Sequence, residues 1–144
     1  MTTELRRELL ADHARRRVGA GAGGEGWTDG HLRSRTCGDE VTVHVHLEGG
    51  IVTALAWEGI GCEISTASAS MLAELLPGTR EDEVPAVIAR IGNLVRGPED
   101  AADDPANDDL GDATALAGIG RLPLRGNCAL LPWRALGAAL DPSL

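Results

Sequence analysis

The stretch VTVHVHLEGGIVTALAW, residues 41–57, decides the fold class of this chain. Its first half alternates valine or leucine with polar residues, the period of two that is typical of a half-buried strand. The Gly49-Gly50 pair then favours a tight turn into a second strand. Apolar side chains recur at helical spacing over residues 63–76, which predicts a helix. The region therefore predicts a β-hairpin that leads directly into a helix.

Two segments of different character precede the hairpin. Residues 3–17 carry a narrow leucine stripe, and Thr3 is a candidate cap, so a first helix is predicted. Six glycines among residues 19–30 predict a flexible loop. We therefore divide the chain into an N-terminal helix and Gly-rich loop, 1–30, and a compact domain, 31–144.

Further helices are predicted in the C-terminal half. An apolar face over residues 84–95 ends at a Gly-Pro pair, and a last helix is expected over 129–140 after an extended or loop segment at 121–127. Residues 99–112 hold seven acidic side chains and no basic one, which predicts a solvated loop. This succession of elements predicts an α+β fold with a small antiparallel sheet packed against helices.

Composition excludes several classes of function. The chain has 144 residues, a net charge of −9, and an aromatic content of 2%. Phosphate backbones require a basic surface and single strands also require stacking aromatics, so nucleic acid is not an expected partner. An anionic membrane surface is disfavoured for the same electrostatic reason, and no apolar run approaches the length of a membrane helix. We expect a soluble, cytoplasmic protein.

The three cysteines are the composition feature that could carry chemistry. Three cysteines are too few for a disulfide framework, and an odd number cannot all pair. In a reducing compartment, free thiols are more often buried, metal-bound or catalytic. Cys37 precedes the first strand, Cys62 lies at the start of helix 63–76, and Cys128 is expected at the start of the last helix. With Asp39 they could form a tetrahedral set for zinc. By spacing alone, the alternative of small buried hydrophobes stays open.

Three motifs resemble one family. They are TCGD at 36–39, WEGIGCEISTASASM at 57–71 and CALLPWRAL at 128–136. The motifs closely resemble the NifU/IscU-like family, and specifically its SufU branch. The resemblance covers roughly residues 31 to 140. It implies the SufE/NifU-like scaffold fold with one zinc ion, and its ligands fall on four positions of this chain: Cys37, Asp39, Cys62 and Cys128.

Two features favour the SufU branch. IscU-type scaffolds have a His before the third cysteine and a Leu-Pro-Pro-Val-Lys segment, whereas this chain has LPLRGN at 122–127. SufU-like proteins carry an extra segment between the second and third cysteines, and residues 97–120 resemble it. They also have an Arg three residues before the last cysteine, the position of Arg125 in this chain. Two departures are Asn127, where SufU-like proteins often have Lys, and an N-terminal pattern that is reduced to Asp12-His13.

The SufU resemblance implies a zinc-dependent sulfurtransferase. Such a protein takes persulfide sulfur from a PLP-dependent cysteine desulfurase of the SufS type and passes it to the SufBCD assembly machinery. A His of the desulfurase would take a zinc position and free Cys37 to attack the persulfide. Cys37 and Arg125 would be the catalytic residues, with Arg125 stabilising the freed thiolate or reorienting Asp39.

Two other functions remain as alternatives. One is a non-enzymatic IscU-type scaffold on which an iron-sulfur cluster is assembled. The other is a thiol hydrolase that uses Cys62, which ranks low because no His is placed by sequence to serve as its base.

The remaining polar features have simpler interpretations. His44 and His46 share the polar side of their strand and are expected to be a solvated face. Ser65, Ser68 and the other serines after Cys62 are expected to permit close helix packing. Trp27 is expected to be an exposed contact in the glycine-rich loop.

Overall fold

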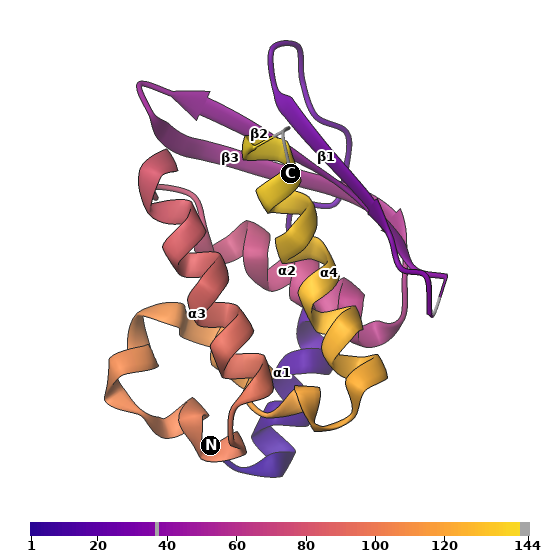
Figure 1. Cartoon of the computed structure of the whole chain (residues 1–144), viewed down its shortest axis with the longest axis vertical. Coiled ribbons are helices and arrows are strands. Elements are labelled where there is room, and N and C mark those ends of the chain that lie inside the picture. Colours follow the sequence, from indigo (N-terminus) through magenta and orange to yellow (C-terminus); the bar gives the residue numbers. More distant parts are fainter. Residues whose placement is uncertain (37, 142–144) are drawn as a thin grey trace.

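A three-stranded antiparallel sheet lies against one side of a group of helices (Figure 1). The chain is represented by a computed structural model, which describes residues 1–36 and 38–141. The sheet has the order β1-β2-β3, with β1 (Thr28–Arg33), β2 (Glu40–Glu48) and β3 (Ile51–Ile60). The helices are α1 (Thr3–Arg16), α2 (Glu63–Leu75), α3 (Val84–Arg96) and α4 (Pro123–Leu140). The expected α+β class with a small antiparallel sheet is confirmed.

The β2–β3 hairpin forms where the alternating sequence predicts it. Val43 pairs with Trp57 and Val45 pairs with Leu55, and all four side chains are buried. Gly49 has φ of 58° and Gly50 has φ of 77°, so both turn residues adopt the left-handed conformation that favours glycine. The turn therefore aligns the valines on the one face of the sheet that meets the helices.

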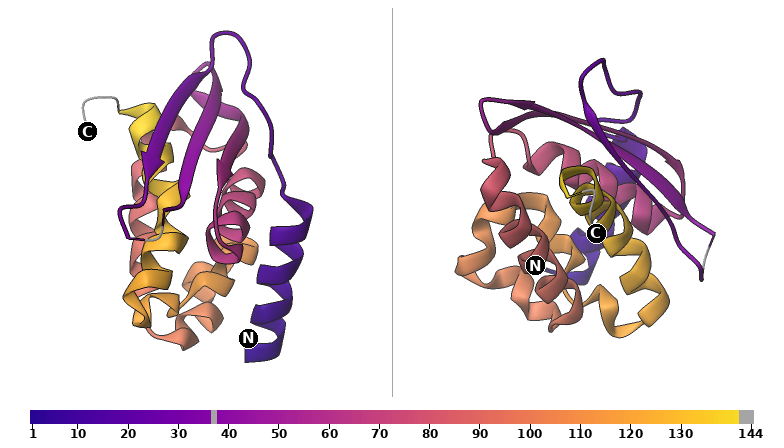
Figure 2. Two further views of the ribbon diagram at one scale, coloured as in Figure 1. Left: turned by 90° about the vertical axis from the view of Figure 1, so that its right-hand side faces the viewer. Right: turned by 45° about the horizontal axis from the view of Figure 1, so that its top comes forward.

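Helix α4 passes beneath β1 and β2 (Figure 2). A side chain at Gly30 of β1 would overlap the carbonyl oxygen of Ala135, so the strand and the helix can approach this closely only at a glycine. Trp133 of α4 is fully buried and donates from Nε1 to Ser68 Oγ of α2 at 2.9 Å. Ser68 in turn donates to the carbonyl oxygen of Ala129 at 2.6 Å. These hydrogen bonds join α2 to α4 in the core.

The glycine-rich segment is held by the sheet over part of its length. The backbone N–H of Trp57 donates to the carbonyl oxygen of Gly19 at 3.0 Å, and Gly21 N–H donates to the carbonyl oxygen of Trp57 at 2.9 Å. At the other end of β3, Val52 exchanges similar bonds of 2.8 and 2.7 Å with Thr79 and Gly78. The prediction of a loop over residues 19–30 also extends too far, because β1 begins at Thr28.

The segment after α3 is more structured than a solvated loop, which corrects the expectation for residues 99–112. It forms the 3₁₀ segments η2 (Glu99–Asp103) and η3 (Pro105–Leu116). Ala102 and Leu110 are buried, whereas most of the acidic side chains around them face solvent. A few small apolar residues therefore hold the segment to the helices. Two shorter 3₁₀ segments are η1 (Glu81–Glu83) and η4 (Ile119–Arg121).

The last helix begins earlier than expected. Pro123 opens α4, where its fixed φ and missing N–H suit the first turn, so residues 123–127 are helical and the expected extended segment is wrong there. Cys128 consequently lies in the second turn of α4 and not at a helix start. No helix in the ranges 1–36 and 38–141 has the length and apolar character needed to cross a membrane.

Candidate metal centre

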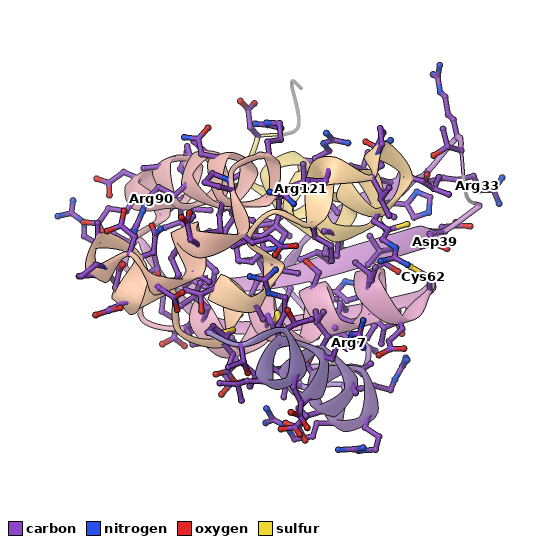
Figure 3. The ribbon with its side chains drawn as sticks, turned by 90° about the horizontal axis from the view of Figure 1, so that it is seen from below. Arg7, Arg33, Asp39, Cys62, Arg90 and Arg121 are labelled. Atoms are coloured by element: carbon purple, nitrogen blue, oxygen red, sulfur yellow. The ribbon has the colours of Figure 1, made fainter. Side chains whose placement is uncertain are left out.

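Three of the four expected ligands meet at one end of the sheet. Donor atoms of Asp39, Cys62 and Cys128 all lie within 4.8 Å of one another. Figure 3 shows Asp39 and Cys62 side by side at this end of the molecule. The fourth expected ligand, Cys37, lies outside the described residues.

Strand pairing explains why Asp39 and Cys62 meet although they are far apart in sequence. Glu40 at the start of β2 is paired with Ile60 at the end of β3, so the residues just beyond this pair emerge next to each other. Cys62 is then the N-cap of α2. Because α4 passes beneath the sheet, its second turn delivers Cys128 to the same place.

Two glycines give the room that this approach requires. A side chain at Gly59 would overlap the carbonyl oxygen of Glu40 on the neighbouring strand. A side chain at Gly61 would overlap Ser65 Oγ. The two glycines therefore let the end of β3 and the start of α2 approach their neighbours closely.

Asp39 is held in place by hydrogen bonds. Its side chain is buried, and Oδ2 accepts from the backbone N–H of Cys62 at 3.2 Å and from Ser65 Oγ at 3.0 Å. Ser65 was expected only to permit close packing, so this contact was missed. Its position three residues after Cys62, in the first turn of a helix, is the signal that could have revealed it.

The two described cysteines differ in exposure. Cys62 is exposed and its Sγ accepts from the backbone N–H of Ser65 at 3.5 Å, whereas Cys128 is buried. The helix N-terminus points its amide donors at the Cys62 sulfur, which suits a metal-bound thiolate. The hydrogen-bond partners recorded for Cys62 within 1–36 and 38–141 include no His, so a hydrolase that uses Cys62 has no visible base.

The donor set fits zinc. Zinc bonds to thiolate sulfur at about 2.3 Å and to carboxylate oxygen at about 2.1 Å, so tetrahedral ligands lie roughly 3.5–4 Å apart. The 4.8 Å limit on the Asp39, Cys62 and Cys128 donors is close to this spacing and needs only small side-chain rotations. Two thiolates and one carboxylate are also a combination that a borderline-soft divalent ion prefers.

Arg125 and Asn127 lie on α4 just before Cys128. Arg125 is exposed in the first turn of the helix, three residues before Cys128, and thus on a neighbouring part of the same helix face. Asn127 is half-buried and lines a hollow beside Thr36. Both residues thus lie within one turn of Cys128 on α4.

His44 does not join the donor set, and the expectation of a solvated face is wrong for it. Gly23 of the glycine-rich segment covers its ring, which is buried. Burial lowers the pKa of His44, but the hydrogen bonds to Asp29 at 2.6 Å and Glu58 at 3.1 Å outweigh it, so the net pKa is raised. His46 contacts the ring of Trp27, with centroids 5.3 Å apart, and Trp27 is therefore only partly exposed.

A second cluster surrounds His13, and sequence analysis did not reveal it. His13 is fully buried where α1 meets α2, and its Nδ1 lies 2.9 Å from Ser70 Oγ. Its Nε2 lies 2.9 Å from Asp112 Oδ2, 3.3 Å from Glu74 Oε2 and 3.1 Å from Arg16 Nη2. The cluster joins three elements that are distant in sequence, so no local pattern predicts it.

Comparisons with known proteins identify the family of this chain. The family model described as the NifU-like N terminal domain matches residues 14–129. The iron-sulfur cluster assembly scaffold protein IscU of Streptococcus pyogenes serotype M1 is 34% identical over 139 residues, which are 94% of this chain and 82% of that protein. The zinc-dependent sulfurtransferase SufU of Bacillus subtilis strain 168 is 37% identical over 105 residues, which are 73% and 69% of the two chains.

Solved structures have the same fold. A crystal structure described as a hypothetical protein has a TM-score of 0.85 at 33% identity and covers 97% of this chain and 99% of its own. The N-terminal NifU-like protein of Brucella abortus has a TM-score of 0.73 at 23% identity, covering 92% and 90%, and supports the fold alone. The chain belongs to the NifU/IscU family of iron-sulfur cluster assembly proteins.

Proposed function

We propose that this chain is a zinc-dependent sulfurtransferase of the SufU type. In this proposal it accepts persulfide sulfur from a SufS-type cysteine desulfurase and passes it to the SufBCD machinery. The observation that carries the proposal is the convergence of Asp39, Cys62 and Cys128, with Arg125 three residues before Cys128 on α4. The similarity to a relative named as a zinc-dependent sulfurtransferase supports it.

Cys37 completes the ligand set and is the sulfur acceptor in this proposal. When bound, zinc keeps its thiol ligands deprotonated at neutral pH and lowers their nucleophilicity. The Cys37 thiolate attacks the outer sulfur of the desulfurase persulfide, a new S–S bond forms, and the desulfurase cysteine leaves as a thiolate. The exchange moves one sulfur atom and needs no external oxidant or reductant.

The other residues of the site position the ligands and supply charge for the sulfur transfer. Ser65 and the Cys62 amide fix one oxygen of Asp39 and so orient its carboxylate toward the sulfurs. Asp39 is the weakest ligand of the set, because carboxylate binds zinc less tightly than thiolate does. Arg125, exposed one turn before Cys128, supplies a positive charge for a freed thiolate or for Asp39.

One experiment tests the proposal directly. The purified protein is analysed for zinc, and desulfurase activity is measured with and without it. We expect about one zinc per chain and a clear stimulation of the desulfurase that Cys37→Ala abolishes. Stimulation that survives Cys37→Ala would contradict the sulfur-acceptor role.

The second candidate is a scaffold for cluster assembly. It is favoured by the similarity to a relative named as the scaffold protein IscU. Anaerobic reconstitution with iron and sulfide distinguishes the two functions. A stable cluster that transfers to an apo acceptor supports the scaffold, whereas tightly held zinc that iron does not displace supports the sulfurtransferase.

A further inference from the structure

A hollow lined by arginines adjoins the metal centre. It has a volume of about 260 Å³ and is lined by Arg33, Arg35 and Arg134, with Thr36 and Asn127 on the side of the cysteines. We call it the arginine hollow. Thr36 directly precedes Cys37 and Asn127 directly precedes Cys128, so the hollow borders two of the proposed ligands in sequence.

The charge of the hollow is opposite to that of the chain. The protein has 22 acidic residues and 13 arginines, yet none of the described residues that line the arginine hollow is acidic. Arg33 is paired with Glu40 at 3.1 Å from outside the lining. Arg35 and Arg134 are exposed, and their side chains form no ion pair or hydrogen bond with any residue in 1–36 or 38–141. Two guanidinium groups of the hollow therefore face solvent without a carboxylate partner in the part of the chain that the structure describes.

The acidic part of the protein lies elsewhere. Segments η2 and η3, which carry the run of carboxylates, are on the opposite side of the helices from the turn between β1 and β2 (Figure 1). An acidic partner is thus repelled by most of the surface and attracted at this end. Such an arrangement orients a partner as it approaches and raises its association rate.

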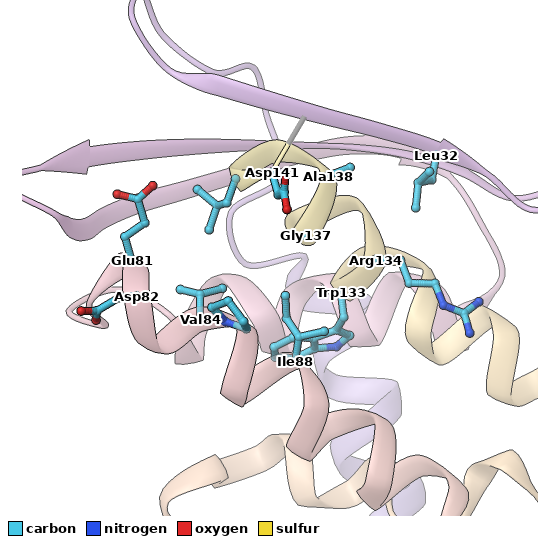
Figure 4. Close-up of a pocket in the computed structure, with 12 residues that line it drawn as sticks. Leu32, Glu81, Asp82, Val84, Ile88, Trp133, Arg134, Gly137, Ala138 and Asp141 are labelled. Atoms are coloured by element: carbon cyan, nitrogen blue, oxygen red, sulfur yellow. The ribbon is translucent and has the colours of Figure 1, made fainter. Parts of the chain in front are cut away.

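The two arginines reach the hollow from different parts of the fold. Arg35 follows β1, and the neighbouring Ser34 N–H donates to the carbonyl oxygen of Asp39 at 2.7 Å, just before β2. Arg134 projects from α4 and also borders a larger, mainly apolar hollow of about 820 Å³, together with Leu32 (Figure 4). A partner segment that reaches Arg134 therefore meets apolar surface next to the positive charge.

We infer that the arginine hollow is the docking site for a carboxylate-bearing segment of the sulfur donor, with Arg35 and Arg134 as the residues that bind it. The inference rests on the proposed function, since the donor is the SufS-type desulfurase. Guanidinium groups bind carboxylates through two parallel hydrogen bonds, which gives orientation as well as attraction. The segment would hold the donor's persulfide beside the metal centre.

Binding kinetics of the zinc-loaded protein with the desulfurase test the inference. We expect Arg35→Glu or Arg134→Glu to weaken binding about tenfold at low salt, and the double variant about 100-fold, mainly through a slower association rate. The difference from wild type should shrink as salt is raised. Zinc content should stay unchanged, because neither arginine is a ligand.

Arg7→Glu is the matched control. Arg7 is exposed on α1, and this helix lies away from the β1–β2 turn (Figure 2). Its replacement by Glu changes the net charge by the same amount as each single variant. It should leave the affinity near that of wild type. If the double variant binds as tightly as wild type while wild type stimulates the desulfurase, the inference is wrong and the proposed function stands. If wild type neither binds nor stimulates the desulfurase, both are wrong.

Discussion

The Asp39–Cys62–Cys128 centre and the His13–Glu74–Asp112 cluster look alike by distance alone. Each brings three potential metal-binding groups within 4.8 Å of one another. They differ in what already occupies the space between the groups. Arg16 Nη2 lies 3.1 Å from His13 Nε2 and 3.6 Å from Glu74, so the chain itself supplies a cation to the His13 cluster.

The contrast shows that proximity of donors does not define a metal site. In the His13 cluster the carboxylates are balanced by Arg16, and the cluster ties α1 to α2 and η3. At the metal centre Asp39 Oδ2 accepts from two neutral donors, Ser65 Oγ and the Cys62 amide, which orient the carboxylate beside the two sulfurs. The first arrangement stabilises the fold, and the second suits a bound cation.

Loss of one thiol should show the largest difference between the two clusters. We expect Cys62→Ser to reduce bound zinc from about one per chain to near zero, because hydroxyl is a poor zinc ligand. Serine is a favoured N-cap, so α2 should still form. Elemental analysis after desalting gives the zinc content. Asp112→Asn is the control and should retain zinc; equal losses in both variants would show that the distinction is wrong.

Because the His13 cluster stabilises the fold, replacement of His13 should cause a large loss of stability. His13→Ala leaves Ser70, Asp112 and Glu74 without their shared partner and opens a cavity, so the free energy of unfolding should fall by about 3 kcal/mol. Urea denaturation followed by circular dichroism measures it. Arg15→Ala on the same helix should change stability little, since that side chain is 76% exposed. A His13→Ala protein of unchanged stability but lower zinc content would reverse the assignment.

Ser65 provides a finer test of the metal centre. Removing its hydroxyl frees Asp39 to rotate, so Ser65→Ala should weaken zinc binding about 10- to 100-fold without abolishing it. Competition with a chromogenic chelator measures the affinity. Ser70→Ala on the same helix removes a hydroxyl from the His13 cluster and should leave zinc affinity unchanged. Equal affinities for Ser65→Ala and wild type would remove Ser65 from the site.

His44 gives the smallest effect, and a test of pH dependence. Its pKa is raised above the ordinary value of 6.5 by Asp29 and Glu58, so the protonated form is favoured by folding. The stabilisation is present below about pH 6.5 and is lost as pH rises through the folded pKa. The stability difference between wild type and His44→Gln should therefore be larger at pH 6 than at pH 9, roughly as linkage requires. A difference that grows with pH would contradict this sign.

Local patterns predicted the parts of the fold that are local. The alternating valines and the Gly49-Gly50 turn determined the hairpin, and the helix after Cys62 ends within one residue of the expected position. Strand β1 was missed because its burial depends on Gly30 fitting against α4, a contact distant in sequence. The start of α4 was missed because a proline and a glycine in 123–127 suggest a loop unless Pro123 is recognised as the first residue of a helix.

The meeting of Asp39, Cys62 and Cys128 was predictable from the sequence, whereas the contacts that support them were not. Cysteine, aspartate and flanking glycines carry the chemistry in their identity, and family resemblance placed them. Ser65 is an ordinary serine in the sequence and becomes important only when Asp39 arrives from the neighbouring strand. The His13 cluster likewise joins residues separated by 57 and 99 positions, which no periodicity connects.

The bonds that attach Gly19, Gly21, Gly78 and Thr79 to β3 also bear on solubility. Strand β3 is at the edge of the sheet, where free backbone groups invite pairing with a strand of another molecule. Trp57 and Val52 have these groups already bonded within the chain, near the two ends of the strand. An incoming strand would therefore meet occupied backbone groups at both positions, so the segments around Gly19 and Gly78 disfavour pairing of this edge with another molecule.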